Sequence, residues 1–211
     1  MKDDKITSRI RLKYFVLFLV IYIIWSLSYT LIGNWTVNMK HYTLSTKINR
    51  NIPFIPDFEY IYALGYLIPF IPLIVIRYVY RMNLLIVSFV VLNLISFTLF
   101  ILFPVYCPRP GLEVSSLSSY LLSLERAVDM PVNNFPSLHA GIAWLIFLSC
   151  RGYSKILSAI LFSIAIGIGI SALFIKQHFT ADIVAGITLA WVVYSILNHF
   201  FIKLYKTATI K

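Results

Sequence analysis

Two short polar strings at the edges of apolar segments hold the residues best suited to chemistry. The first is Pro136-Ser137-Leu138-His139, and the second runs from Lys176 to Asp182 and contains His178. Ionisable side chains within or beside membrane spans are energetically costly, so their presence there indicates function. His178 and Asp182 are four residues apart, which places them on one face of a helix. A carboxylate in that position fixes the tautomer of the imidazole and leaves its other nitrogen free to attack.

Positive charge and a helix start accompany the two histidines. His139 begins a segment just after Pro136, a residue type favoured in the first turn of a helix, and N–H groups at a helix start attract anions. Arg109 and Lys176 add two cations. Such a set suits phosphoryl transfer, which depends mainly on positioning and charge stabilisation. No metal-ligand spacing of the C-x-x-C or H-E-x-x-H kind occurs, so we expect neither a metal ion nor another cofactor.

Each of these residues also has a purely structural explanation. His178 with Asp182 could form a polar clamp between helices, Arg109 could extend its charge to lipid headgroups, and Ser137 could cap a helix. Taken singly, these explanations remain open. The occurrence of all the residues in three loops on one predicted side of the chain favours a shared site.

Composition identifies the class of protein. The 211 residues are 60% hydrophobic and only 12% charged, about half the charged fraction of soluble domains, and the mean hydropathy is +0.85. The net charge is +10. Because the basic residues cluster at the ends of apolar segments, they indicate membrane topology and contact with anionic lipids. We therefore expect an integral membrane protein whose partners are membrane lipids and not nucleic acid.

Apolar segments predict an all-α bundle of six transmembrane helices. A helix needs about 20 apolar residues to cross a bilayer, and the candidate spans are Tyr14–Ile32, Ile61–Ile76, Leu84–Phe103, Ser137–Cys150, Ile156–Ile175 and Ala181–Ile202. Together they form one membrane domain over residues 14–202, between a basic N-terminal segment (1–13) and a tail (203–211). Pro69 and Pro72 should kink the second span. The fourth reaches roughly 21 Å, so either it continues past Arg151 or its start is sunk below the membrane surface.

The distribution of lysine and arginine predicts the orientation. The segments on the side of the termini hold twelve of these residues, and those on the other side hold six. The positive-inside rule therefore predicts that both termini are cytoplasmic. Loops 33–60, 104–136 and 176–180 would then face outward, with the site on the extracytoplasmic face. Short loops and the lack of further domains favour a bacterial inner membrane.

The polar residues resemble the three motifs of the PAP2 (type 2 phosphatidic acid phosphatase) superfamily, approximately K-x6-R-P, P-S-x-H and S-R-x5-H-x3-D. Arg109-Pro110 matches the end of the first motif, residues 136–139 match the second, and Ser171, His178 and Asp182 match the third. The order of the motifs and the six predicted spans agree with this family over roughly residues 50–200.

Two positions depart from these motifs. The lysine of the first motif would fall at Leu102 and the arginine of the third at Ala172, and we expect Lys176 to substitute for one of them. Residues 52–56 and 173–178 look like the branch that includes fungal inositol phosphorylceramide synthase. That branch transfers a lipid phosphoryl group to an alcohol.

The resemblance implies a metal-independent phosphatase acting on a lipid phosphate or pyrophosphate at the outer leaflet. His178 would attack phosphorus to give a phosphohistidine, Asp182 would orient it, and His139 would act as acid and then base. Arg109, Ser137 and Lys176 would bind the phosphate.

Other functions remain open at this stage. The same site could serve a lipid headgroup phosphotransferase with an alcohol acceptor. Less favoured are a membrane protein that binds haem through two histidines and an inactive scaffold.

Overall fold

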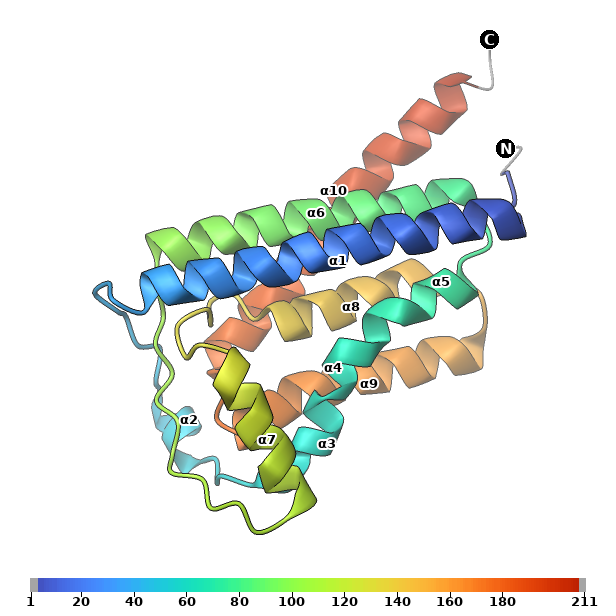
Figure 1. The fold of residues 1–211 in the computed structure, drawn as a ribbon. Helices are drawn as coiled ribbons and strands as arrows, with labels where there is room; N and C mark the ends of the chain where they lie inside the picture. The colour runs from blue at the N-terminus through green and yellow to red at the C-terminus, as the bar shows by residue number, and fades with distance from the viewer. Residues whose placement is uncertain (1–3, 209–211) are drawn as a thin grey trace.

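The structure is a computed structural model that describes residues 4–208 (Figure 1). Its described part contains no strand, and the all-α class predicted from the sequence is confirmed. The long helices are α1 (Ser8–Thr36), α6 (Val79–Leu102), α8 (Leu138–Cys150), α9 (Lys155–Phe174) and α10 (Thr180–Ala208). The short elements are α2 (Lys47–Asn51), η1 (Pro56–Phe58), α3 (Glu59–Tyr62), α4 (Leu64–Leu67), η2 (Ile68–Phe70), α5 (Ile71–Val75) and α7 (Leu117–Val128).

The two predicted terminal segments join the flanking helices. Helix α1 begins at Ser8, inside the predicted segment 1–13, and α10 continues to Ala208, inside the predicted tail. Residues 1–3 and 209–211, which complete those segments, lie outside the described residues.

Five of the described helical segments are long and apolar enough to cross a membrane. They correspond to the first, second, third, fifth and sixth predicted spans. The fourth is α8, which has 13 residues and is shorter than a normal span. Its backbone becomes extended at Arg151, so the alternative in which this helix continues past Arg151 is wrong. At about 1.5 Å per residue it reaches roughly 20 Å.

The second span is a chain of short helical pieces between Pro56 and Val75. Pro69 lies in η2 and Pro72 in the first turn of α5. Proline cannot donate a backbone hydrogen bond, so the predicted interruption of this helix is confirmed. The carbonyl groups at the end of a helix lack partners within it. At the end of α5, Arg11 of α1 is such a partner, since its guanidinium donates to the carbonyl oxygens of Leu73 and Ile76.

Helix α8 lies at the centre of the bundle, packed against α10, α9 and α6. It meets α10 at two glycines. A Cβ atom added to Gly186 would lie 2.2 Å from the carbonyl oxygen of Ser137, and one added to Gly141 would lie 3.0 Å from the carbonyl oxygen of Gly186. Small residues allow membrane helices to approach closely in this way. The start of α8 is therefore held directly against α10.

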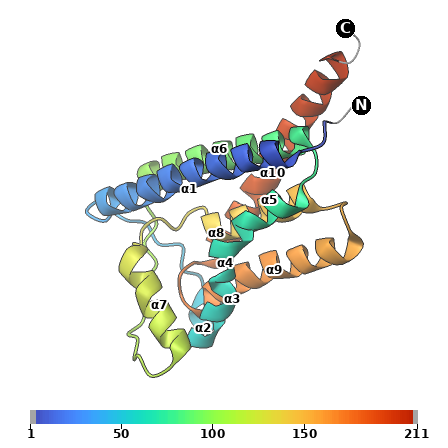
Figure 2. The ribbon, with the colours of Figure 1, turned by 45° about the vertical axis from the view of Figure 1, so that its right-hand side comes forward.

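The loops that carry the polar strings gather at one end of the bundle. In Figures 1 and 2 both chain termini lie at the opposite end. Isolated bridges pair Tyr42 with Val105 and Val105 with Asn133. They connect loop 33–60 with two stretches of loop 104–136. The loop predicted over residues 104–136 contains α7, a helix that was not expected from the sequence.

Candidate active site

His178 is positioned by the turn that ends α9. The N–H of Gln177 donates to the carbonyl of Ala172 at 2.9 Å, and the N–H of Lys176 donates to that of Leu173 at 3.3 Å. This pairing is the Schellman motif, whose central residue has a left-handed backbone that is usually glycine. Here Lys176 takes that place with a φ of 60°. The turn reverses the chain and sets His178 directly before α10.

Asp182 is completely buried in the first turn of α10, where it faces His178. One oxygen, Oδ2, accepts the N–H of Phe179 at 2.7 Å and lies 3.5 Å from Nδ1 of His178. Among the described residues, Nδ1 of His178 and Oδ1 of Asp182 have no hydrogen-bond partner. The carboxylate thus both caps its own helix and faces the imidazole, at a distance that a bound substrate could shorten.

His139 is positioned by the capped start of α8. The Oγ of Ser137 accepts the N–H of Ala140 at 3.4 Å, and the N–H of Ser137 donates to the backbone carbonyl of Asp182 at 2.9 Å. The capping role foreseen for Ser137 is therefore present. The hydrogen bond to Asp182 also joins the two sequence motifs, which are more than 40 residues apart in the chain.

The ring of His139 is held by Tyr62, a residue that the sequence did not single out. The hydroxyl of Tyr62 lies 2.8 Å from Nδ1 of His139, and the two ring centroids are 4.5 Å apart. Tyr62 is fully buried, so this hydrogen bond gives its hydroxyl group a partner. With Nδ1 engaged, Nε2 of His139 is the nitrogen available for reaction. The ring centroids of His139 and His178 are 6.3 Å apart.

The two predicted phosphate-binding cations both have protein partners. The guanidinium of Arg109 donates to the backbone oxygen and to Oδ2 of Asp129, each at 2.6 Å. The ammonium of Lys176 donates to the carbonyl oxygens of Asn49, at 3.1 Å, and Ile52. Burial lowers the pKa of Lys176. Both cations line the same cavity as His178. Some of their N–H donors already bond to oxygen atoms of the protein.

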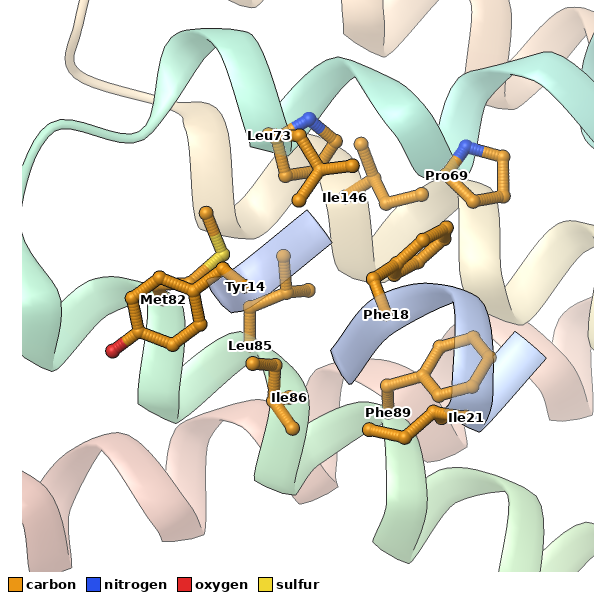
Figure 3. A pocket seen from close by; sticks show the side chains of 11 residues that line it. Tyr14, Phe18, Ile21, Pro69, Leu73, Met82, Leu85, Ile86, Phe89 and Ile146 are labelled. Carbon is orange, nitrogen blue, oxygen red and sulfur yellow. The ribbon is translucent and has the colours of Figure 1, made fainter. Parts of the chain in front are cut away.

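A cavity of about 380 Å³ opens beside His178. Arg109 and Lys176 line it, and Arg50 of α2 contributes a third cation. Elsewhere the bundle encloses an apolar pocket of about 20 Å³, which Figure 3 shows between Tyr14, Phe18 and other hydrophobic side chains. That pocket has room for about one water molecule. The cavity beside His178 is the one with the size and charge for an anionic headgroup.

A family model described as the PAP2 superfamily matches residues 33–196. The chain belongs to the PAP2 superfamily. The membership expected from the motifs is confirmed, and it supports a phosphatase-like function. The matched residues include the two histidines of the site, Asp182 and the three cations of the cavity. Comparisons with curated proteins and with solved structures found no match.

The structure explains how this PAP2 chain departs from the family's motifs. Ala172, at the position of the motif arginine, is buried in the turn that ends α9. Leu102, at the position of the motif lysine, is 71% exposed and does not line the cavity. The guanidinium of Arg50 makes no hydrogen bond or ion pair with the part of the chain that the structure describes, so it is free to meet a ligand. Arg50 lies outside the three motifs of the family. Its neighbours in the sequence do not distinguish it from the other cations in the loops.

Acidic groups lie behind the cavity, on the side of α7. Glu125 is buried, and it accepts a hydrogen bond from the hydroxyl of Tyr66 at 2.8 Å and from Nε2 of Gln177 at 3.5 Å. Burial, together with the nearby Asp129 and Glu59, raises the pKa of Glu125 to about 8. Because Gln177 directly precedes His178, this contact connects α7 to the turn that positions the nucleophile candidate.

Proposed function

We propose that this PAP2 protein is a membrane lipid phosphatase that hydrolyses a lipid phosphate or pyrophosphate through a phosphohistidine. The observation that carries the proposal is the pair of imidazoles 6.3 Å apart, one of them facing a buried carboxylate, beside a cavity with three cations. A headgroup phosphate in that cavity would lie next to His178. The apolar surface of the bundle would hold the acyl or prenyl chains in the membrane.

In the first step, Nε2 of His178 attacks phosphorus and forms a P–N bond while the bond to the lipid oxygen breaks. Asp182 keeps the ring oriented and balances the positive charge that develops on it. The proton that the departing alkoxide needs comes from Nε2 of His139, whose Nδ1 is held by Tyr62. The products are the dephosphorylated lipid and a phosphohistidine.

In the second step, His139 accepts a proton from water as the water oxygen attacks phosphorus. The P–N bond breaks, free phosphate leaves, and His178 returns to its starting state. Each histidine is therefore used twice, which fits two rings whose centroids lie 6.3 Å apart.

Positive charge for the phosphate oxygens would come from side chains. We assign the direct contact to Arg50, whose guanidinium is free in the described structure. Arg109 and Lys176 contribute their field from fixed positions, since protein oxygens hold both. Ser137 acts through the helix start that it caps. With this charge supply, activity should persist in excess chelator.

The acceptor is the point on which the alternative function differs. If an alcohol replaces water in the second step, the same residues perform lipid headgroup phosphotransfer, as in the inositol phosphorylceramide synthase branch that the sequence resembles. Assays with labelled lipid phosphate, with and without candidate alcohols, separate the two. Release of free phosphate supports hydrolysis, and label transferred to the alcohol supports phosphotransfer.

The site also has an orientation in this proposal. The excess of lysine and arginine near the termini predicts that both termini are cytoplasmic. The cavity, at the other end of the bundle, would then face the extracytoplasmic side of a bacterial inner membrane. A reporter fused to the C-terminus should then read as cytoplasmic. An external reading would reverse the orientation and leave the chemistry unchanged.

The mechanism predicts that His178→Ala and His139→Ala each abolish phosphate release while membrane insertion and yield stay normal. Asp182→Asn should lower the rate by about 10⁴-fold, as for a base that loses its orienting acid. The measurement is phosphate release from a panel of lipid phosphates by purified protein. His199→Ala is the matched control, because His199 is an exposed histidine of α10 far along the chain from the site.

Full activity in either catalytic-histidine variant would refute the assignment. Acid-labile label retained on wild-type protein, and absent from His178→Ala, would locate the covalent intermediate. Loss of wild-type activity in chelator, restored by a divalent ion, would favour a different mechanism.

A further inference from the structure

Helix α7 has an inverted distribution of polar and apolar side chains. The buried side chains facing the protein include Ser118, Ser119 and Glu125. The outward side carries large apolar side chains at helical spacing, which are Leu117 (62% exposed), Tyr120 (50%), Leu124 (49%) and Val128 (66%). A helix on the surface of a soluble protein shows the opposite arrangement. The outward face of α7 is therefore made for an apolar surrounding.

Both charged residues of α7 are turned toward the protein. Glu125 bonds with Tyr66 and Gln177, and Arg126 donates to the carbonyl oxygens of Pro110 and Ile175. The four outward residues thus form a continuous face without charge on a helix that the structure describes completely. The polar contacts fix the rotation of α7, so this face cannot turn inward without breaking them.

The direction of α7 suits the edge of a bilayer. In Figures 1 and 2 it runs across the direction of α1 and α6, and in neither view does it extend past the loop end of α1. Exposed aromatic residues stand at the same end of the bundle, with Trp35 in the last turn of α1 and Tyr60 in α3. Such residues are enriched at the membrane–water interface, and Tyr120 of α7 adds to them.

The outward face of α7 also lies beside an exposed apolar surface of the second span. A cavity of about 380 Å³ opens where α7 packs on the second span, lined by Leu121, Leu124, Glu125 and Val128 of α7 and by Glu59, Ala63 and Tyr66 of the span. Beyond it, the span itself exposes Leu64 and Leu67. Acyl chains packed against these exposed leucines would also meet the outward face of α7.

We propose that α7 lies in the membrane interface, with its Leu117, Tyr120, Leu124 and Val128 face inserted among the acyl chains of the leaflet nearest the site. The occupant is bilayer lipid. This placement does not depend on the proposed enzyme activity. In this placement only α7 lies between the membrane surface and the turn that holds His178, because Glu125 on the buried face of α7 bonds to Gln177.

The test uses a spin label on single introduced cysteines in the full chain, reconstituted in vesicles of phosphatidylethanolamine and phosphatidylglycerol. The native Cys107 and Cys150 are both buried, and burial raises the pKa of the Cys107 thiol to about 12, so wild-type protein should take up little label. Leu124→Cys and Val128→Cys report on α7. Leu94→Cys, at an exposed position within α6, is the lipid control, and Glu113→Cys, in the exposed loop before α7, is the water control.

Collision with oxygen, which concentrates in lipid, is compared with collision with a water-soluble nickel chelate. We expect labels at residues 124 and 128 to prefer oxygen, as at residue 94, and the label at residue 113 to prefer the chelate. A label at residue 124 that behaves like the one at 113 would overturn the proposal. A label immobile and inaccessible to both reagents would also overturn it, because a protein surface would then cover α7.

Discussion

Arg50 is the residue to which we assign the direct phosphate contact that the family's motifs place on other cations. The two motif positions for cations hold Leu102 and Ala172, and the cations retained near the site are bound by protein oxygens. Arg50 lines the same cavity as His178, and its guanidinium has no partner within the described chain. Its charge is therefore available to a substrate oxyanion, where the fork of a guanidinium matches phosphate geometry.

We predict that Arg50→Gln lowers kcat/KM by about 10-fold to 100-fold, since a hydrogen bond to a charged group contributes about 1.5–3 kcal/mol. Lys47→Gln is the matched control, because Lys47 is an exposed cation of the same helix that does not line the cavity. Initial rates at several lipid phosphate concentrations give the comparison. Equal losses in both variants would indicate a general surface-charge effect and contradict the specific role of Arg50.

At this scale the sequence predicted the residues that belong to spaced motifs. His139, His178 and Asp182 lie together in the structure, as their types and spacing indicated. Tyr62 and Arg50 were missed, because each reaches the site from a segment far away in the chain and neither has a motif around it. Only the folded arrangement brings the hydroxyl of Tyr62 to Nδ1 of His139.

The contact between α8 and α10 is the element-scale feature on which the site depends. His139 belongs to α8 and Asp182 to α10, and the two helices meet at Gly186, where an added Cβ atom would lie 2.2 Å from the backbone oxygen of Ser137. A backbone oxygen at a helix start cannot move aside as a flexible side chain can. Any substituent at this position must therefore push the helices apart.

We predict that Gly186→Ala lowers the free energy of unfolding by about 1–3 kcal/mol, as is typical of overpacking, and reduces activity far more. Activity is the more sensitive readout because a displacement of about 1 Å at a catalytic group costs roughly 100-fold in rate. Gly111→Ala is the control, since a Cβ atom there meets no described atom within 4 Å. A fully active Gly186→Ala protein would show that this contact does not position the histidines.

Apolar helices, including α8 with only 13 residues, could be predicted from hydropathy, and α7 could not. The second span was expected to bend at Pro69 and Pro72, and it breaks into pieces there. Helix α7 escaped notice because its 12 residues lie in a loop rich in serine. Its apolar residues are too few to cross a bilayer, and its buried side carries Ser118, Ser119 and Glu125 beside Leu122, so neither the membrane pattern nor the pattern of a soluble helix applies.

The whole molecule combines a bundle that suits lipid with one polar end. The family and the all-α class followed from composition and motifs, because both depend on local sequence. The network behind the cavity did not, since Glu125, Asp129 and Glu59 come together only through tertiary packing. This network makes the stability of the entire fold depend on pH.

Glu125 sets the direction of that dependence. Its pKa in the folded chain is about 8, against an ordinary value of 4.5, because burial and the neighbouring carboxylates of Asp129 and Glu59 oppose its ionisation while Arg109 favours it. Between these two pH values the folded state binds more protons than the unfolded state. Stability must then fall as the pH rises across this interval, and the contribution of the protonated group is lost above about pH 8.

We therefore predict that the thermal unfolding midpoint of the purified protein in detergent falls by several degrees between pH 6 and pH 9, because each 1 kcal/mol corresponds to about 2–4 °C in a chain of this size. Glu125→Gln should flatten this slope, since an amide cannot ionise and its oxygen can still accept the hydroxyl of Tyr66. If both proteins lost stability equally over that interval, another group would control the dependence. If the wild-type midpoint rose with pH, the buried carboxyl would have to be ionised in the folded chain at neutral pH, and the pocket behind His178 would carry a negative charge opposing the bound phosphate.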